Sequence, residues 1–513
     1  MLAGIGEDSG LAEAPVLKRL LLLLALLALA MPVRAQDRVV IASGVDVVGL
    51  DALGVIVLNP DRSLMDHISD TLLRWEAPGK LAPFLATSWS NIDPLTWELH
   101  LREGVTFQDG EPFDAESVKF SYETVLDPAN KAPARADHTF VDHVQVIDPH
   151  TVRIITKTPY PTAPNQFTML HMMPPAYVRK VGIDAYRQHP VGTGPYKFVE
   201  HVRDDHVTLQ AWDGYWGGPQ PIKTIIYRPI KEDAARVAAL LAGEVDMVMD
   251  VPPEMVPLIQ RTKGMAVKMV PSARVYVMTL STLFPDYPTT KQPVREAINY
   301  GIDRASLNKN ILGGTGAPSS WINPNTFGFN PDLKPLPYDP ARAKKLLAEA
   351  GYPGGVDLVL DAPAGKYVKD KEIAEAMAGQ LSQAGIRTTV KTYEWGVLTK
   401  RIWSHQASPL ALFAWGDTRG DPGSVNKLVL QTGATWSQGK DAKLDALIDR
   451  IEGEMNPETR KALIYEEQAY LRETFPIASV VQLGAIFGTS AKLDWWQPRP
   501  DEKVWLYKTP KLP

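Results

Sequence analysis

The 513-residue sequence contains no cysteine. This excludes disulfides, thiolate metal sites, cysteine nucleophiles and the cysteine that would carry a lipid anchor. Net charge is also small, because 54 Lys and Arg face 59 Asp and Glu, for a total of −5, and no basic block occurs. A nucleic-acid or anionic-membrane footprint is therefore missing, and we expect no nucleic-acid partner.

Motifs of enzymes and metal sites are missing as well. The sequence has no Gly-x-Ser-x-Gly and no His-Glu-x-x-His pattern. His138 and His143 are five apart in a polar, loop-like stretch, so a helix would not place them together; His405 leaves imidazole ligation open. We expect no enzyme, no cofactor and no metal. The alternative is a secreted hydrolase that uses Asp417 and Asp421 as a carboxylate pair, although residues four apart beside a proline are more simply a turn.

The sequence has one long apolar run, Leu20–Met31, which follows Lys18 and Arg19 and precedes the small-residue pattern Val33-Arg34-Ala35. This pattern predicts a signal peptide region over 1–35, cleaved before Gln36. The run is too short to span a bilayer, which needs about 20 residues. A membrane anchor is the competing interpretation, but no second run of spanning length follows. We expect a periplasmic protein secreted through a cleaved signal peptide, and not a lipoprotein.

The remaining sequence alternates strand-like and helix-like patterns. It is 45% hydrophobic, which is typical of a globular protein of two or three domains. The alternation of Trp97, Leu99 and Leu101 predicts a strand with one solvated face. Further patterns predict helices: Asp114 before Val118, Tyr122 and Val125; Val237 to Gly243; Asp339-Pro340; Ile373, Met377 and Leu381; and Asn456-Pro457. These are α/β units, and loops rich in Pro and Gly predict segment boundaries near 190–195 and 271–288.

A series of short segments, weak singly, is specific in its order and spacing. The segments are Leu81-Ala82 to Trp89; Leu101-Arg102-Glu103-Gly104-Val105 to Asp109-Gly110; Ser117-Val118 to Ser121; Pro190-Val191-Gly192-Thr193-Gly194-Pro195-Tyr196; Tyr215-Trp216-Gly217-Gly218; Ala242-Gly243-Glu244-Val245-Asp246; Val294-Arg295-Glu296-Ala297-Ile298 to Asp303-Arg304; and Tyr338-Asp339-Pro340 to Ala350-Gly351-Tyr352. Together they resemble the family 5 extracellular solute-binding proteins of ABC importers, the dipeptide, oligopeptide and nickel group. The resemblance covers nearly the whole chain after residue 35.

The resemblance implies an α/β fold of the two-lobed periplasmic binding protein type II (cluster C) with an additional domain. It divides the chain into lobe I (36–75, 191–276 and 486–513), the extra domain (76–190) and lobe II (277–485). It implies a monomer that closes by a hinge over a peptide or peptide-like cationic small molecule and delivers it to an inner-membrane ABC permease. The alternatives are a periplasmic peptide chaperone or sensor, and a binder of opines, glycosides or nickel chelates.

The resemblance places the ligand site at Ala414–Pro422. Asp417 matches the acidic residue that receives the ligand ammonium in peptide binders of the family, and a carboxylate in a closed cleft suits that role. Gly416 would leave room for the ligand backbone, and Trp415 would offer an apolar wall or a cation face. The alternative is that Asp417 is a turn residue and Trp415 a core aromatic.

A second group of candidates lies outside that loop. Lys366, in Gly365-Lys366-Tyr367, stands where some peptide-binding relatives have an arginine for the ligand carboxylate; an ammonium offers a point charge without a bidentate fork. A solvated lysine is the alternative. Arg419 is another candidate cation, unless Asp421 pairs with it. Trp395 and Trp436 are candidate pocket walls, although tryptophan is more often a core residue.

Overall fold

The computed structural model describes residues 37–54, 59–77, 79–324, 326–416 and 419–508. The predicted signal peptide region, 1–35, and Gln36 lie outside these residues. Within the described ranges, no helix has both the length and the apolar character needed to cross a bilayer. The fold below is that of the described residues.

Most strands join one large sheet of eleven strands. Its order is β15 (Ile386–Tyr393), β14 (Val356–Pro363), β16 (Leu410–Gly416), β12 (Met265–Leu280), β17 (Ile477–Ser490), β11 (Met247–Val248), β1 (Arg38–Ser43), β10 (Thr224–Pro229), β9 (His206–Ala211) and β8 (Tyr196–Val202), with β13 (Ala317–Pro318) pairing with β17. Strands from both ends of the chain therefore meet in one sheet, which local sequence patterns cannot show.

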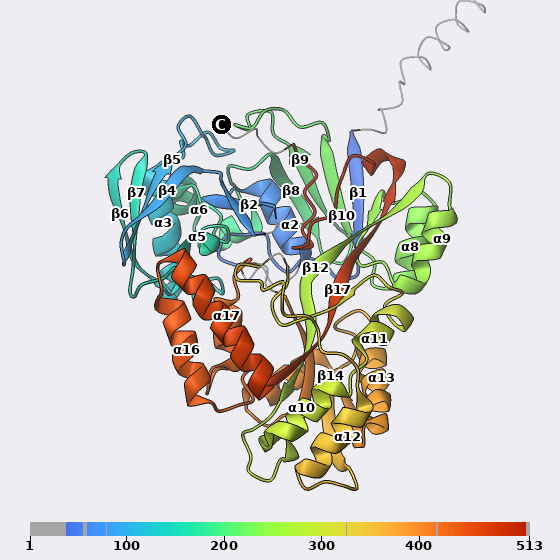
Figure 1. The fold of residues 1–513 in the computed structure, drawn as a ribbon. Helices are drawn as coiled ribbons and strands as arrows, with labels where there is room; N and C mark the ends of the chain where they lie inside the picture. The colour runs from blue at the N-terminus through green and yellow to red at the C-terminus, as the bar shows by residue number, and fades with distance from the viewer. Residues whose placement is uncertain (1–36, 55–58, 78, 325, 417–418, 509–513) are drawn as a thin grey trace, which may run out of the picture.

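Two long antiparallel strands connect the halves of this sheet. β12 and β17 run through the centre of the molecule and link its upper and lower parts (Figure 1). The prediction of a loop boundary at 271–288 is wrong for its first part, because residues 271–280 belong to β12. Pro271 has no N–H to donate, and the ladder tolerates it because the register shifts between Pro271 and Val275.

The β11–β1–β10–β9–β8 half of the sheet falls in the segments predicted for lobe I. β1 pairs in parallel with both β10 and β11, so it is buried on both faces. Val39 and Ile41 pack in one core and Val40 and Ala42 in another, as the two-residue period of a strand requires. The helices of this region are α2 (Asn59–Ile68), α8 (Asp233–Leu241) and α9 (Val256–Arg261), with short 3-10 turns η2 (Pro253–Met255) and η4 (Ala491–Leu493).

The β15–β14–β16 half falls in the segment predicted for lobe II. Its core contains Ile373, Met377 and Leu381, the stripe that the sequence predicts for one helix face. Asp339 and Asn456 cap the two helices that begin with proline, as predicted. The helices are α10 (Gln292–Tyr300), α11 (Arg304–Asn310), α12 (Pro340–Glu349), α13 (Asp370–Gln383), α14 (Trp395–Trp403), α15 (Gly423–Leu430), α16 (Ala442–Gly453) and α17 (Pro457–Thr474), with η3 (Pro288–Thr290).

The extra domain has its own sheet and its own core. The sheet order is β4 (Ala86–Asp93), β5 (Thr96–Leu101), β7 (Thr151–Thr156) and β6 (Val141–Asp148), and a separate ribbon pairs β2 (Leu73–Ala77) with β3 (Lys80–Pro83). Asp114 caps α3 (Ala115–Leu126) through a capping box with Ser117. The other helices are α4 (Arg135–His138), α5 (Ala163–Gln166), α6 (Pro175–Val181) and α7 (Ile183–Gln188), with η1 (Pro128–Asn130).

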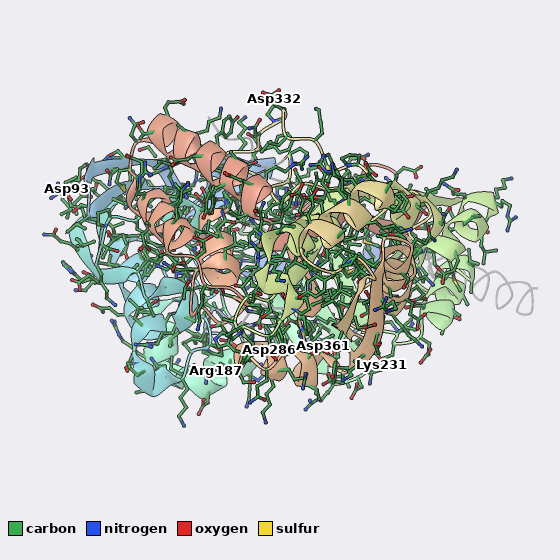
Figure 2. The ribbon with its side chains drawn as sticks, turned by 60° about the horizontal axis from the view of Figure 1, so that its bottom comes forward. Asp93, Arg187, Lys231, Asp286, Asp332 and Asp361 are labelled. Carbon is green, nitrogen blue, oxygen red and sulfur yellow. The ribbon has the colours of Figure 1, made fainter. Side chains whose placement is uncertain are left out.

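The extra domain widens the molecule on one side. Asp93, at the end of β4, lies at the far left of the molecule in Figure 2, whereas Lys231, after β10, lies at its lower edge, right of the centre. The predicted boundaries at 75/76, 276/277 and 485/486 fall inside β2, β12 and β17. The assignment of each whole segment to a lobe stays a prediction.

Candidate functional site

Four of the candidate aromatic residues lie together in one cluster. Their rings form a chain of contacts, with centroid distances of 5.4 Å for Tyr367–Trp395, 5.9 Å for Trp395–Trp436 and 5.2 Å for Trp436–Trp415. All four are half-buried against the core around β16. The structure thus joins residues that are up to 69 positions apart in the sequence. Whether this cluster touches ligand stays a prediction, because packed and partly exposed rings suit both roles.

Lys366 belongs to the same cluster. Its Nζ lies 5.5 Å from the centroid of the Trp395 ring, which places the ammonium over the ring face. Burial, and then the positive charge of Arg274, lower the pKa of Lys366. The loop is held by the Asp370 carboxylate, which accepts the backbone N–H groups of Gly365, Lys366 and Tyr367 at 3.1, 2.8 and 3.0 Å. Lys366 is therefore fixed at its base and half-buried, unlike a freely solvated lysine.

Asp417, the predicted ammonium receptor, lies outside the described residues. Its neighbour Gly416 ends β16 and stands opposite Arg274 in the ladder with β12. A Cβ on Gly416 would come within 3.7 Å of Arg274, an ordinary contact. Packing within the described residues therefore does not require glycine at 416, which is compatible with the predicted need for ligand space.

Arg419 connects lobe II to the extra domain. Its guanidinium pairs with Asp137 of α4 at 2.5 Å, and its backbone oxygen accepts a hydrogen bond from Asn165 Nδ2 at 2.7 Å. The suggested pairing of Arg419 with Asp421 is not what the structure shows. The loop after β16 instead contacts the extra domain, so it lies where the two parts of the molecule meet.

Asp421 is more than the turn residue that the sequence suggests. Its Oδ1 accepts the N–H of Gly423 at 2.9 Å, as in a turn, but both carboxylate oxygens also pair with Arg460 of α17 at 2.5 and 2.7 Å. Asp421 and Arg460 are 5% and 4% exposed, which makes the pair a buried one. The pair fixes the end of the candidate loop to α17, and sequence spacing gave no signal of it.

Two glutamates lie near this pair, Glu467 fully buried and Glu452 partly buried, and they give a pH prediction. Burial raises the pKa of Glu467 to about 8 and that of Glu452 to about 7. Because an unfolded glutamate ionises near pH 4.5, the folded state binds more protons between about pH 4.5 and 8, so stability falls as the pH rises through that window. We expect Glu467→Gln to lose less stability than the wild-type protein between pH 5 and 8, measured by urea unfolding at each pH. If the free energy of unfolding falls equally with pH in both proteins, Glu467 is not the group whose raised pKa causes the loss.

One charged pair near the cluster could not be predicted from the sequence. Arg274 of β12 pairs with Glu502 at 3.0 Å, and its guanidinium lies 6.0 Å from the Tyr367 ring. The charge of Glu502 raises the pKa of Arg274. Since the segment 271–288 resembles a loop in sequence and Glu502 is 228 residues away, no local signal connects them.

Three cavities found among the described residues are small. One of about 70 Å³ lies between Trp321, Arg304 and Arg472. A cavity of about 20 Å³ lies against Trp415, Trp321 and Asn426, and a second of about 20 Å³ lies between lobe I and the extra domain. The ion pair between Arg419 and Asp137, which holds the loop after β16 against α4, agrees with the small volume of these cavities.

The histidines are dispersed. His138 ends α4 and is buried, whereas His143 is in β6 and exposed, so the stretch between them is not the loop that the sequence suggests. Across the described ranges, no three or more His, Asp or Glu side chains are grouped so that they could hold a metal ion.

Two lobes joined by two crossing strands, with a loop of lobe II closing on an extra domain, define an α/β binding-protein fold of type II. Comparisons with known sequences and structures support this fold class. The profile of "Bacterial extracellular solute-binding proteins, family 5 Middle" matches residues 80–437. The chain belongs to this family, and the predicted fold class is confirmed.

Individual relatives can be named as well. The chain is 32% identical over 323 residues to the glutathione-binding protein GsiB of Escherichia coli (strain K12), and the match covers 62% of this chain and 62% of that protein. It therefore spans less than two thirds of the length of such curated relatives.

Among solved structures, NikA from Brucella suis in complex with Fe(III)-EDTA superposes with a TM-score of 0.82 at 23% identity, covering 92% of this chain and 100% of that chain. DppA from Helicobacter pylori in complex with the peptide STSA gives 0.75 at 23% identity, covering 91% and 96%. These two likenesses concern the fold.

Proposed function

We propose that the protein is a periplasmic substrate-binding protein of an ABC importer. It captures a peptide or peptide-like cationic small molecule by hinge closure and delivers it to an inner-membrane permease, without catalysis. The observation that carries this proposal is the pair β12 and β17, which joins two lobes in a chain of the family 5 solute-binding proteins. Ligand that bridges both lobes favours closure by its differential affinity for the closed state.

The ligand class follows from the candidate residues. Asp417 supplies the carboxylate for a ligand ammonium. The cluster of Trp415, Trp436, Trp395 and Tyr367 offers half-buried rings, and Trp415 is two residues before Asp417 in the sequence. Relatives named for binding glutathione and a peptide support ligands with a free ammonium. Lys366 then adds a second charge of opposite sign to Asp417, so the proposed ligand carries both an ammonium and an anionic group.

A thermal-shift panel tests this proposal. At about one hundred times its dissociation constant, a ligand adds ~2.7 kcal/mol to the stability of the native state. We therefore expect dipeptides, tripeptides or glutathione to raise the melting temperature. N-acetylated forms of the same compounds, which lack the ammonium, should not. Shifts with sugars or metal ions alone would contradict the peptide class, and shifts with opines alone would favour the opine alternative.

The export route has its own test. We expect the periplasmic form to begin at Gln36 and to carry no lipid, because the sequence offers no cysteine for acylation. Intact-mass and N-terminal analysis of the periplasmic fraction would show both. A product that retains Leu20–Met31, or that partitions into detergent, would support the anchor interpretation.

A further inference from the structure

A small cavity between lobe I and the extra domain contains an unpaired arginine. The cavity is about 20 Å³ in volume, room for a group the size of one water molecule. Arg74 of β2, which borders it, is only 7% exposed, and its Nε and Nη1 atoms have no hydrogen-bond partner. Its guanidinium lies 4.8 Å from the centroid of the Phe84 ring, and none of the ion pairs found among the described residues includes it.

The other charges around this cavity are already paired. Asp66 accepts hydrogen bonds from Lys503 at 2.8 Å, from Trp505 at 2.7 Å and from His171 at 3.0 Å. Burial alone would raise the pKa of Asp66, but Lys503 and His171 hold it well below its usual range. Asp501 pairs with Arg499 at 2.7 Å. Neither carboxylate is therefore left to balance Arg74.

The remaining carboxyl group nearby balances it poorly. Burial raises the pKa of Asp70 to about 7, even though Arg74 acts in the opposite direction. Asp70 Oδ2 accepts a hydrogen bond from Trp216, and its Oδ1 has no partner. Among the described residues, the cavity therefore borders a buried guanidinium whose Nε and Nη1 atoms lack an acceptor.

We propose that Arg74 is an anion-binding residue that receives a carboxylate through a charge-assisted hydrogen bond from its Nε or Nη1 atom. The cavity has room for one carboxylate oxygen and excludes a whole peptide, so it takes the tip of a larger ligand or of a free small carboxylate. Trp75, the next residue, borders the same cavity and abuts Gly420 of lobe II, where an added Cβ would lie 2.9 Å from the indole ring. The cavity therefore adjoins the candidate loop. As a ligand subsite, this role rests on the function proposed above.

The first arm of the test needs no ligand of the importer. Sodium acetate should raise the melting temperature of the wild-type protein in a saturable way, compared with sodium chloride at equal ionic strength. Arg74→Gln should abolish that rise and should be at least as stable as wild type without acetate, because it removes a buried unpaired charge. Arg179→Gln is the matched control, since Arg179 also lies over a ring of the extra domain, Phe120, but is exposed. An equal acetate effect in Arg74→Gln, or none in the wild type, overturns the proposal.

The second arm identifies the source of the carboxylate. Calorimetry compares the dipeptide Ala-Ala with its C-terminal amide. If the ligand supplies the carboxylate, both Arg74→Gln and the amide should lose about ten- to one-hundred-fold in affinity, without adding to each other. If Arg74→Gln and the C-terminal amide both leave the affinity unchanged, while acetate still raises the melting temperature specifically, the site takes a free carboxylate. If no peptide binds but acetate still has its specific effect, the proposed function is contradicted and the anion site stands.

Discussion

Replacing Asp417 by alanine should weaken the binding of an ammonium-bearing ligand by roughly thirty- to several-thousand-fold. The reason is that a ligand ammonium in a closed cleft depends on an acceptor for its charge and its hydrogen bonds. Removing one partner of such a pair leaves the other desolvated and unpaired, at ~2 to 5 kcal/mol. Asp417→Asn keeps the shape and removes the charge, so it should fall between wild type and alanine. Calorimetry with the strongest binder of the thermal-shift panel measures all three proteins.

The control for this experiment comes from the structure. Asp421, four residues on, is unsuitable because it is buried and paired with Arg460. Asp286 is exposed, also belongs to lobe II and is labelled in Figure 2. Asp286→Asn should leave affinity within a few-fold of wild type. Unchanged binding by Asp417→Ala would remove the ammonium assignment, while the family and the fold would stand.

Local structure was predictable wherever it depends on residues that are close together in the sequence. Asp114, Asp339 and Asn456 begin helices because their side chains satisfy the free N–H groups of the first turn, and these contacts span two or three residues. The apolar stripe of α13 and the alternation of β5 are likewise set by a fixed period.

Tertiary pairing was not predictable in the same way. Pro271 marks a loop in most sequences, yet here it lies in a long strand whose partner is over two hundred residues away. The structure brings Tyr367, Trp395, Trp415 and Trp436 together, while their role as ligand contacts stays a prediction. Arg419–Asp137 and Arg74 depend on contacts between distant segments, for which local patterns carry no signal.

Replacing Arg460 by methionine should lower the free energy of unfolding by about 3 to 5 kcal/mol. Arg460 neutralises Asp421 inside the protein and also donates from Nε to the Ile451 oxygen at 3.0 Å. Without it, the Asp421 carboxylate would remain buried beside Glu452 and Glu467, whose raised pKa values already reflect that burial. Urea unfolding measures the loss as a lower midpoint at an unchanged slope.

The matched control is Arg450→Met. Arg450 lies on the neighbouring helix α16 and pairs with Glu466 at 3.5 Å, but both side chains are more than half exposed. An exposed pair contributes about 0 to 1 kcal/mol, so this variant should unfold close to the wild-type midpoint. Similar losses in both variants would mean that arginine packing, and not a buried charge pair, sets the effect.

A double variant separates the pair from its parts. Asp421→Asn alone should also cost several kcal/mol, because it leaves the Arg460 guanidinium buried and uncompensated. In Asp421→Asn/Arg460→Met neither charge remains, so the loss should be smaller than the sum of the single losses. Ligand affinity provides the link to function, since Asp421 holds the end of the loop that carries Asp417. If ligand binding requires the loop after β16 to be held by the Asp421–Arg460 pair, the double variant should regain stability but not ligand affinity. If it regains both stability and affinity, the pair acts on folding alone.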